Sequence, residues 1–400
     1  MEEKLVKKII WMLSIFLIIF SSWVFFTKLY YNPEKIDILE NNIKLRIKYT
    51  GFNNGHDLAI DENGNFYIGL NDRIQYIDTE GESYLLVKDE SLSINSLEYN
   101  NKHLYYSSKN KIFDFDIVKK TNSVLINDLP NYGDYGESII KAKDNMLYIS
   151  IGAATNSGVV GSDNKWLRNY PYNYDLSPKD LILKGMNFGK DKTGAFLPNA
   201  TKSSKTQKIS AHFPANATII RKNLSNAQNE GFAWGIRNVK GMDFDVNGKL
   251  FATIGGMEER GLRPIKFDTD YIFEIKQNLW YGWPDFSGGD AINSPRFKGS
   301  SNVLLLDNPP SVNPPAPVLQ NKYLSSLGSL AIDRTGVIGE ANAIYYYDEK
   351  TKTIYQMNSQ GAVKGILRIS LKNKIISMKF TAEGLVLLEG GTGYIIEAYK

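Results

Sequence analysis

The chain has 400 residues, 42% of them hydrophobic, so it is long enough to bury a large core. It carries 47 basic and 43 acidic residues, and the net charge of +4 is spread along the sequence, which argues against nucleic acid as a partner. It contains no cysteine, which excludes disulfides, thiolate metal sites and cysteine nucleophiles.

The first predicted element is a hydrophobic helix at the N-terminus. Three lysines within the first eight residues precede an uncharged run at residues 9–27, whose length is near what a helix needs to cross a hydrocarbon core. A cleaved signal peptide is the alternative, but the run is longer than an ordinary signal-peptide core and bulky residues follow it. We therefore predict a single-pass anchor in the cell membrane over residues 1–31. The lysines place the N-terminus in the cytoplasm and residues 32–400 outside the membrane.

After the anchor, apolar and polar residues alternate over short runs that Asn, Asp and Gly turns separate, which is the pattern of β-strands. Asn-Gly and Asp-Asn pairs tolerate the positive backbone torsions of tight hairpins. One turn-and-strand unit recurs six times in residues 32–400, which predicts an all-β fold, a β-propeller with six blades. The six units lie at residues 61–70, 100–108, 144–152, 245–255, 333–336 and 382–391.

Two intervals between these units are about twice as long as the others and must contain insertions. The insertions span residues 156–208 and 280–323, and we expect them on the face of the propeller that binds ligands. The last strand, at residues 394–399, is expected to complete a blade with sequence from the start of the body. Such closure would remove two exposed sheet edges.

The insertions and their surroundings contain unusual sequence strings. Residues 152–167 read GAATNSGVVGSDNKWL, residues 234–241 read WGIRNVKG, residues 260–265 read RGLRPI and residues 280–289 read WYGWPDFSGG. Together they resemble the quinoprotein glucose/sorbosone dehydrogenases, and the likeness extends from Gly55 to the C-terminus. The resemblance implies a six-bladed propeller that holds pyrroloquinoline quinone (PQQ) and calcium at one face, where a sugar carbon gives up a hydride.

The resemblance also implies roles for particular residues. Arg237 matches the arginine that reaches the quinone and Asn238 matches its neighbour, although Arg237 could instead pair with a carboxylate inside the propeller. Trp283 is a candidate wall for the cofactor or a packing residue. Asp134 and Tyr135 occupy the positions of an aspartate and of the catalytic histidine, and both are candidate catalytic residues, with Asp134 also expected to contact the cofactor.

The sequence departs from the family at the catalytic base. No histidine lies between His103 and His212, and the ordinary pKa of tyrosine, near 10, makes Tyr135 a poor replacement. Asp134 or Glu137 could serve only if burial raised its pKa by several units.

Calcium is implied by the family, and carboxylate oxygens are the ligands it prefers. Glu259, Asp268 and Asp270 lie around the fourth predicted hairpin and are the candidate ligands. Solvated surface carboxylates are the alternative interpretation of each.

Three functions remain open from the sequence. The first is an extracytoplasmic, membrane-anchored sugar dehydrogenase that uses PQQ, takes a sugar or related alcohol as its small-molecule substrate and passes electrons to an acceptor that the sequence does not identify. The second is a propeller that has lost the chemistry and binds carbohydrate or the cell envelope. The third is a calcium-dependent hydrolase of the lactonase type, because such propellers also gather carboxylates at one mouth.

Overall fold

The computed structural model of the chain describes Trp11 and residues 36–226, 228–297, 302–369 and 374–400. This part of the chain is built from β-strands and contains only two short 3-10 helices, η1 (Lys165–Arg168) and η2 (Pro295–Phe297). It includes no helix long and apolar enough to cross a membrane. The predicted span at residues 9–27 lies outside the described residues, apart from Trp11.

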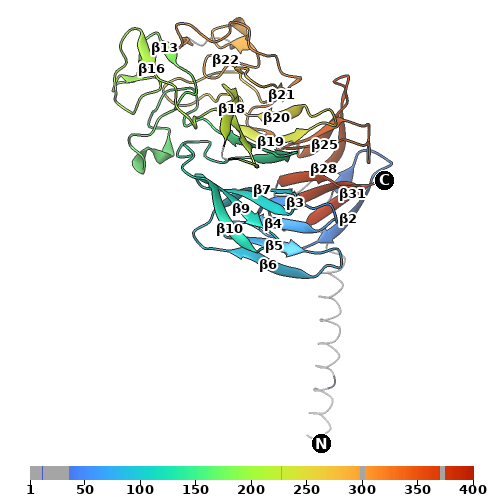
Figure 1. Ribbon diagram of the computed structural model, residues 1–400. Coiled ribbons are helices and arrows are strands. Elements are labelled where there is room, and N and C mark those ends of the chain that lie inside the picture. The colour runs from blue at the N-terminus through green and yellow to red at the C-terminus, as the bar shows by residue number, and fades with distance from the viewer. Residues whose placement is uncertain (1–10, 12–35, 227, 298–301, 370–373) are drawn as a thin grey trace, which may run out of the picture.

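Six antiparallel sheets confirm the prediction of a six-bladed propeller (Figure 1). From the innermost strand outward, the first three blades are β3 (Gly55–Ile60), β4 (Phe66–Leu70), β5 (Arg73–Ile77) and β6 (Ser83–Lys88); β7 (Ile94–Asn100), β8 (His103–Ser108), β9 (Lys111–Asp116) and β10 (Thr121–Ile126); β11 (Ile140–Lys143), β12 (Met146–Ile151), β17 (Thr218–Asn223) and β18 (Asn229–Trp234).

The remaining blades follow the same order. They are β19 (Val239–Phe244), β20 (Leu250–Ile254), β21 (Tyr271–Ile275) and β24 (Leu319–Gln320); β25 (Leu327–Asp333), β26 (Ala343–Asp348), β27 (Thr353–Met357), β28 (Val363–Ile369) and, at its outer edge, β1 (Ile36–Ile38); β29 (Ile375–Phe380), β30 (Leu385–Glu389), β31 (Ile395–Tyr399) and β2 (Lys44–Tyr49). The inner strands of successive blades are neighbours around the centre, and the ring closes where β29 meets β3.

The ring is closed by pairing between the two ends of the described body. The N-terminal strand β2 is antiparallel to the C-terminal strand β31, with Lys44 opposite Tyr399 and Tyr49 opposite Ile395. This confirms that the last strand completes a blade with sequence from the start of the body. Because every blade then has neighbours on both sides, no open face of the ring is left for aggregation.

The strands form where the turn residues allow the chain to reverse. Asp61 shows the recurring chemistry, because its Oδ1 accepts hydrogen bonds from the backbone N–H groups of Asn63 and Asn65, each at 2.9 Å. Gly64 in the same turn has a φ of 87°, a conformation that favours glycine. The second strand of this blade, β4, is buried along its whole length, because it is covered on both faces by neighbouring blades.

The two insertions meet one another and lie together beyond β18–β21, at the upper edge of Figure 1. The first contains β13 (Leu181–Leu183), β14 (Asn187–Phe188), β15 (Thr193–Gly194) and β16 (Gln207–Ile209); the second contains β22 (Phe286–Ser287) and β23 (Asp290–Ala291). Leu183 bridges to Leu306, and the buried Arg263 donates to Asp285 Oδ1 at 2.7 Å. A shared apolar cluster that includes Phe196 and Trp283 fixes the two insertions to each other.

A network of charges, buried or half-buried except for the exposed Arg334, crosses the centre near the far ends of the inner strands. Lys379 Nζ lies 3.0 Å from Glu98 Oε2, Lys141 Nζ lies 3.3 Å from Glu98 Oε1 and 3.2 Å from Asp243 Oδ1, and Arg334 lies 2.6 Å from the same Asp243 oxygen. The charges alternate in sign. We call Glu98, Lys141, Asp243, Arg334 and Lys379 the lower network; it joins four of the inner strands and the end of a fifth.

Candidate functional site

A cavity of about 750 Å³ lies at the opposite end of the centre, where the inner strands begin. Its lining comes from loops and strand starts of all six blades, including His56, Asn95 and Ile376. Charged side chains of both signs line it: Glu137, Arg237, Lys240, Glu258, Asp270, Glu349 and Lys374. We call this space the central cavity. Its volume is in the range of small-molecule sites in proteins.

Arg237 lies in the loop between β18 and β19 and projects into the wall of the central cavity. Only 4% of the residue is exposed. Its Nη2 donates to Asn156 Oδ1 at 2.8 Å and its Nε donates to the Asn156 carbonyl at 3.0 Å, and Glu258 Oε1 lies 3.6 Å away. The guanidinium carbon is 4.1 Å from the centroid of the Tyr135 ring. The arginine is therefore held by the first insertion, by a carboxylate and by an aromatic face.

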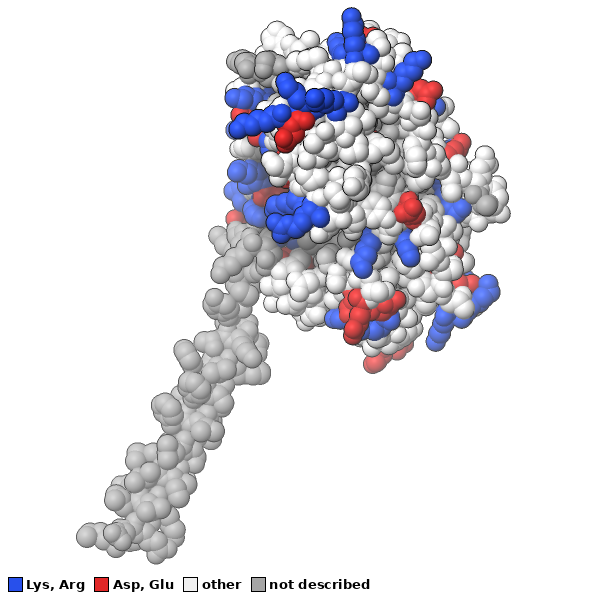
Figure 2. Space-filling model, turned by 90° about the vertical axis from the view of Figure 1, so that its left-hand side faces the viewer, with Lys and Arg blue, Asp and Glu red and all other residues white. Residues whose placement is uncertain are grey.

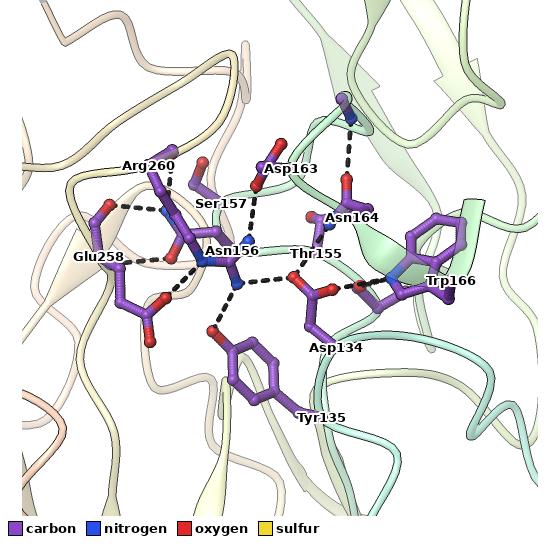
Figure 3. Close-up of polar contacts among 12 residues, drawn as sticks. Asp134, Tyr135, Thr155, Asn156, Ser157, Asp163, Asn164, Trp166, Glu258 and Arg260 are labelled. Carbon is purple, nitrogen blue, oxygen red and sulfur yellow. Dashed lines mark hydrogen bonds and ion pairs between the residues drawn. The ribbon is translucent and has the colours of Figure 1, made fainter. Parts of the chain in front are cut away.

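Tyr135 stands between two guanidinium groups, as Figure 3 shows for Arg260. Its hydroxyl accepts a hydrogen bond from Arg237 Nη2 and another from Arg260 Nη2 at 2.9 Å. Burial raises the pKa of the Tyr135 hydroxyl above its ordinary value, although both arginines act in the opposite direction. The hydroxyl is therefore protonated at neutral pH and cannot serve as a general base.

Asp134 is fully engaged by protein donors. Its Oδ2 accepts from Arg260 Nη2 at 2.6 Å and from Asn164 Nδ2 at 2.9 Å, while Oδ1 accepts from the indole N–H of Trp166 at 2.9 Å (Figure 3). Asn164 and Trp166 belong to the first insertion. Asp134 therefore ties the insertion to Arg260, and it does not line the central cavity among the described residues.

Arg260 and Glu258 organise this mouth, and the sequence analysis assigned no role to Arg260. The guanidinium of Arg260 contacts three carboxylates: Asp134, Asp163 at 2.6 Å and Glu258. Burial alone would raise the pKa of Glu258, but Arg237 and Arg260 outweigh it and hold that pKa below its ordinary value. Glu258 is thus an anionic carboxylate on the cavity wall at neutral pH. We call Tyr135, Asn156, Arg237, Glu258 and Arg260 the arginine mouth.

Asn238 and Trp283, the other predicted cofactor contacts, occupy different environments. Asn238 lines the central cavity beside Arg237. Trp283 is buried in the apolar cluster of the insertions, where its indole N–H donates to the Asn156 carbonyl at 3.1 Å and its ring packs against Phe196. Trp283 therefore supports Asn156 from behind, and it is not among the described residues that line the central cavity.

The structure does not bring Glu259, Asp268 and Asp270 together as a set of metal ligands. Glu259 is paired with Lys266 at 3.1 Å on the surface. Asp268 accepts from the Met257 N–H at 2.6 Å and the Ser287 hydroxyl at 2.7 Å, and Asp270 accepts four backbone N–H groups. Within the described part of the chain, no group of three or more His, Asp or Glu side chains is arranged to hold a metal.

Asp175 lies beneath the loop that carries Asn156. It is fully buried, and its carboxylate accepts from the Ala154 N–H at 2.6 Å and from the Thr155 hydroxyl at 2.5 Å. Burial raises its pKa to about 7, and the nearby Asp134 acts in the same direction. Asp175 thus holds residues 154 and 155, and with them Asn156, beside Arg237. It does so through a carboxyl group whose pKa is near neutral.

Comparisons with known proteins show which solved structures share this fold. No sequence-family profile and no curated protein matches the chain. The PQQ domain of pyranose dehydrogenase from Coprinopsis cinerea, in its holo form, matches with a TM-score of 0.60 and 10% identity over 92% of this chain and 97% of that one. The PQQ-bound aldose sugar dehydrogenase from Streptomyces coelicolor gives 0.55 and 15% over 92% and 98%.

A third structure, the calcium form of the Trichoderma reesei enzyme of carbohydrate-active family AA12, gives a TM-score of 0.60 and 13% identity over 91% of this chain and 96% of that one. The fold is a sugar-dehydrogenase-like six-bladed propeller. At these identities the likeness establishes the architecture alone, so the chemistry has to be argued from the residues.

The central cavity has four carboxylates on its wall, but it also holds donors that fit an anionic organic cofactor. Arg237, Asn238, Lys240 and Lys374 all line the central cavity, and they offer cationic and amide donors to a planar polycarboxylate such as PQQ. The three predicted calcium ligands are occupied by protein donors, as described above. We therefore derive no step through calcium.

Proposed function

We propose that this protein is an extracytoplasmic sugar dehydrogenase that holds PQQ in its central cavity and is anchored to the membrane by residues 9–27. The observation that carries the proposal is the position of Arg237 and Asn238 on the wall of that cavity, beside the exposed Lys240. The fold shared with proteins whose structures contain PQQ supports it.

The residues of the cavity wall have two tasks in this proposal, which are to bind the cofactor and to accept a proton. When bound, PQQ would supply a quinone that takes up a hydride, with its two electrons, from a sugar carbon that carries a hydroxyl group. Arg237, Asn238, Lys240 and Lys374 would bind the anionic groups of the cofactor. The sugar hydroxyl also loses a proton, which must go to a base. The two electrons finally leave to an external acceptor.

Glu258 is the residue we assign to accept that proton. It is charged at neutral pH, it lines the cavity, and it lies 3.6 Å from Arg237. Its lowered pKa makes it a weak base, so we expect slow oxidation compared with a site that uses imidazole. Tyr135 is excluded from this role by its raised pKa, and we assign it to positioning Arg237.

The test is reconstitution of the full chain with PQQ, with and without calcium, followed by titration of bound cofactor by absorbance and by dye reduction with a panel of aldoses. We expect binding and slow reduction in the wild type. Glu258→Gln should keep cofactor binding and abolish reduction, whereas Arg237→Ala should weaken binding by about 1.5–3 kcal/mol, the value of a charge-assisted hydrogen bond. No binding at micromolar cofactor would exclude the proposal.

A specific observation favours a second function. The position of the family base is occupied by Tyr135, whose hydroxyl is capped by two guanidinium groups. This arrangement suits a propeller that binds carbohydrate at the same cavity without oxidising it. Cofactor or sugar binding without dye reduction, in both the wild type and Tyr135→His, would establish this second function in place of the first.

The membrane anchor has its own test. The full chain should partition with the membrane fraction and resist extraction with carbonate, and a chain that lacks residues 1–31 should appear in the soluble fraction. Protease added to intact cells should reach the propeller only if it lies outside the membrane. Protection of the propeller in intact cells and its digestion after lysis would place it in the cytoplasm instead.

A further inference from the structure

A second large space lies outside the central cavity. It is a groove of about 1070 Å³ between the two insertions, and it shares no lining residue with the central cavity among those described. Its floor includes Trp234 and Trp280, whose rings are 5.9 Å apart. Trp234 is half-buried and Trp280 is buried. We call this space the side groove.

The two walls of the side groove differ in chemistry. One wall is the proline-rich segment 308–316, which adds the exposed amides of Asn308 and Asn313. Because consecutive prolines hold the chain extended, this wall is stiff. The other wall begins with Lys179 and Asp180 and continues into β13, which is joined to the opposite wall where Asp307 N–H donates to the Ile182 carbonyl at 2.8 Å.

The insertion that forms the second wall is strongly basic and its cations are free. Its lysines are all exposed, and none of them forms an ion pair within the part of the chain that the structure describes: Lys165, Lys179, Lys184, Lys190, Lys192, Lys202, Lys205 and Lys208. Elsewhere on the surface, lysines do find carboxylates, as in Lys119–Asp116 and Lys266–Glu259. Exposed lysines without an ion pair also occur elsewhere in the described chain, as at Lys44 and Lys350, but this insertion gathers eight of them.

The acidic residues of the same insertion are too few to neutralise these lysines. Asp163 is bound to Arg260 and Asp175 is buried, which leaves the exposed Asp180 and Asp191. Figure 2 looks onto the face that lies at the left in Figure 1, where β13 and β16 are, and its upper part carries more blue basic side chains than red acidic ones. The insertion therefore presents an uncompensated positive field beside the side groove.

We propose that the side groove and the basic insertion bind an acidic polysaccharide, a chain of sugar rings that bear carboxylate groups. A sugar ring offers C–H groups to the exposed part of Trp234 and hydroxyls to the amides of Asn308 and Asn313. The carboxylates lie against the lysines, where charge-assisted hydrogen bonds form. The open ends of a groove admit a polymer, whereas the central cavity is sized for a single small molecule.

Lys179 lines the side groove, and Lys184 and Lys208 lie further along the same insertion. Lys184 N–H donates to the Leu305 carbonyl at 2.8 Å, just before the proline-rich wall begins, and Lys208 is paired with Ile182 across β13 and β16. Both side chains are exposed. A polymer that extends from the groove along β13 would therefore meet these two cations.

The experiment measures binding of the full chain, in detergent, to polygalacturonate at low ionic strength, with neutral dextran as the comparison polymer and phosphatidylglycerol vesicles as a second anionic surface. We expect binding to polygalacturonate that weakens with added salt and no binding to dextran. Lys184→Glu/Lys208→Glu should weaken it by about tenfold or more, since each reversal replaces an attraction with a repulsion. The matched control Lys44→Glu/Lys350→Glu changes two exposed lysines on other blades and should bind like the wild type.

Asn308→Ala/Asn313→Ala tests the groove itself and should weaken polygalacturonate binding several-fold without changing folding. Equal binding of this variant and the wild type would exclude the groove. Equal binding of the two lysine variants would exclude the insertion, and binding to vesicles without binding to polygalacturonate would exclude a polysaccharide ligand. Polygalacturonate binding is measured without PQQ or dye, so this test does not depend on the proposed dehydrogenase activity.

Discussion

The two ends of the central channel both contain buried charges, and they use them differently. In the lower network, positive and negative groups alternate from Lys379 to Arg334, and most of these side chains come from regular inner strands. In the arginine mouth, Arg260 alone meets three carboxylates, and every member comes from a loop. The lower network joins the inner strands to one another, whereas Tyr135, Arg237 and Glu258 of the mouth line the central cavity.

The comparison shows which buried charges are available to bind a ligand. In the lower network, burial would lower the pKa of Lys379, but Glu98 outweighs it and holds that pKa above its ordinary value, so the ion pair remains charged. Partners fixed on strands leave no donor for a ligand. In the mouth, loops present the same kinds of groups to a cavity, where a ligand can add to the existing partners.

The largest effect should come from breaking the lower network. Glu98→Ala leaves Lys379 without its partner and Lys141 with only Asp243, so we expect a loss of about 3–5 kcal/mol in the free energy of unfolding, measured by urea denaturation. Glu98→Leu/Lys379→Met, which removes both charges of one pair, should recover much of that loss. If the single variant is as stable as the wild type, the network does not hold the inner strands together.

The second-largest effect concerns how the free energy of unfolding depends on pH, through Asp175 near the arginine mouth. The pKa of Asp175 is about 7 in the folded protein, above its ordinary value near 4, so the folded state binds the extra proton between these values. Stability due to this group is therefore present at low pH and is lost as pH rises through 7, by about 1.4 kcal/mol per pH unit. Relative to Asp175→Asn, the wild type should lose stability between pH 5 and 7 and stay level above pH 8.

The same experiment separates the two ends of the channel. The protection factors for hydrogen exchange at residues 153–157 should fall between pH 5 and 7 in the wild type and stay constant in Asp175→Asn, because the charged carboxylate weakens the buried loop beneath Asn156. The protection factors in β7 and β29, which carry part of the lower network, should not change. An equal fall at both ends would show that the transition is global.

A smaller effect is expected at Arg260. Arg260→Ala removes a partner from Asp134, Asp163 and Glu258, but its side chain is 28% exposed and water can replace part of the interaction. We expect a loss of about 1–2 kcal/mol in unfolding free energy, with a rise in the pKa of Glu258 that should be visible in the pH profile of any dye reduction. Arg260→Lys, which keeps the charge, should restore part of both.

The smallest effect should follow from Tyr135→Phe. The ring beneath Arg237 stays in place and only the hydroxyl is lost, so the free energy of unfolding should change by less than about 1 kcal/mol. Cofactor binding should be retained. A complete loss of dye reduction with unchanged binding would show that the hydroxyl takes part in proton transfer, contrary to its assignment as a positioning group.

The fold was predictable because it rests on local chemistry. Turns such as Asp61–Gly64 and the alternation that follows them reveal the strands, and their recurrence reveals the blades. The membrane anchor stays a prediction, because its residues lie outside the described part of the chain.

The site was predictable only where a residue could be recognised by its neighbours in sequence, as Arg237 and Asn238 could. The ion pair of Arg260 with Asp134 joins loops of different blades, and no local sequence pattern predicts it. In the sequence, Lys141 and Glu98 look like ordinary polar positions of inner strands. They face each other as an ion pair only once the ring of blades has formed. The expectation that the net charge is spread along the sequence is wrong for residues 156–208, where the surplus of lysines over acids could have revealed the basic insertion.

The closing strands impose an order on biosynthesis. β1 pairs with β28 and β2 pairs with β31, so the first two strands of the body border blades that are made last. During translation these early strands leave the ribosome long before their partners exist, and four complete blades can assemble while they wait. A chain that stops before Ile395 therefore has a ring that cannot be sealed, and quality-control proteases would meet unpaired edges at both of its ends.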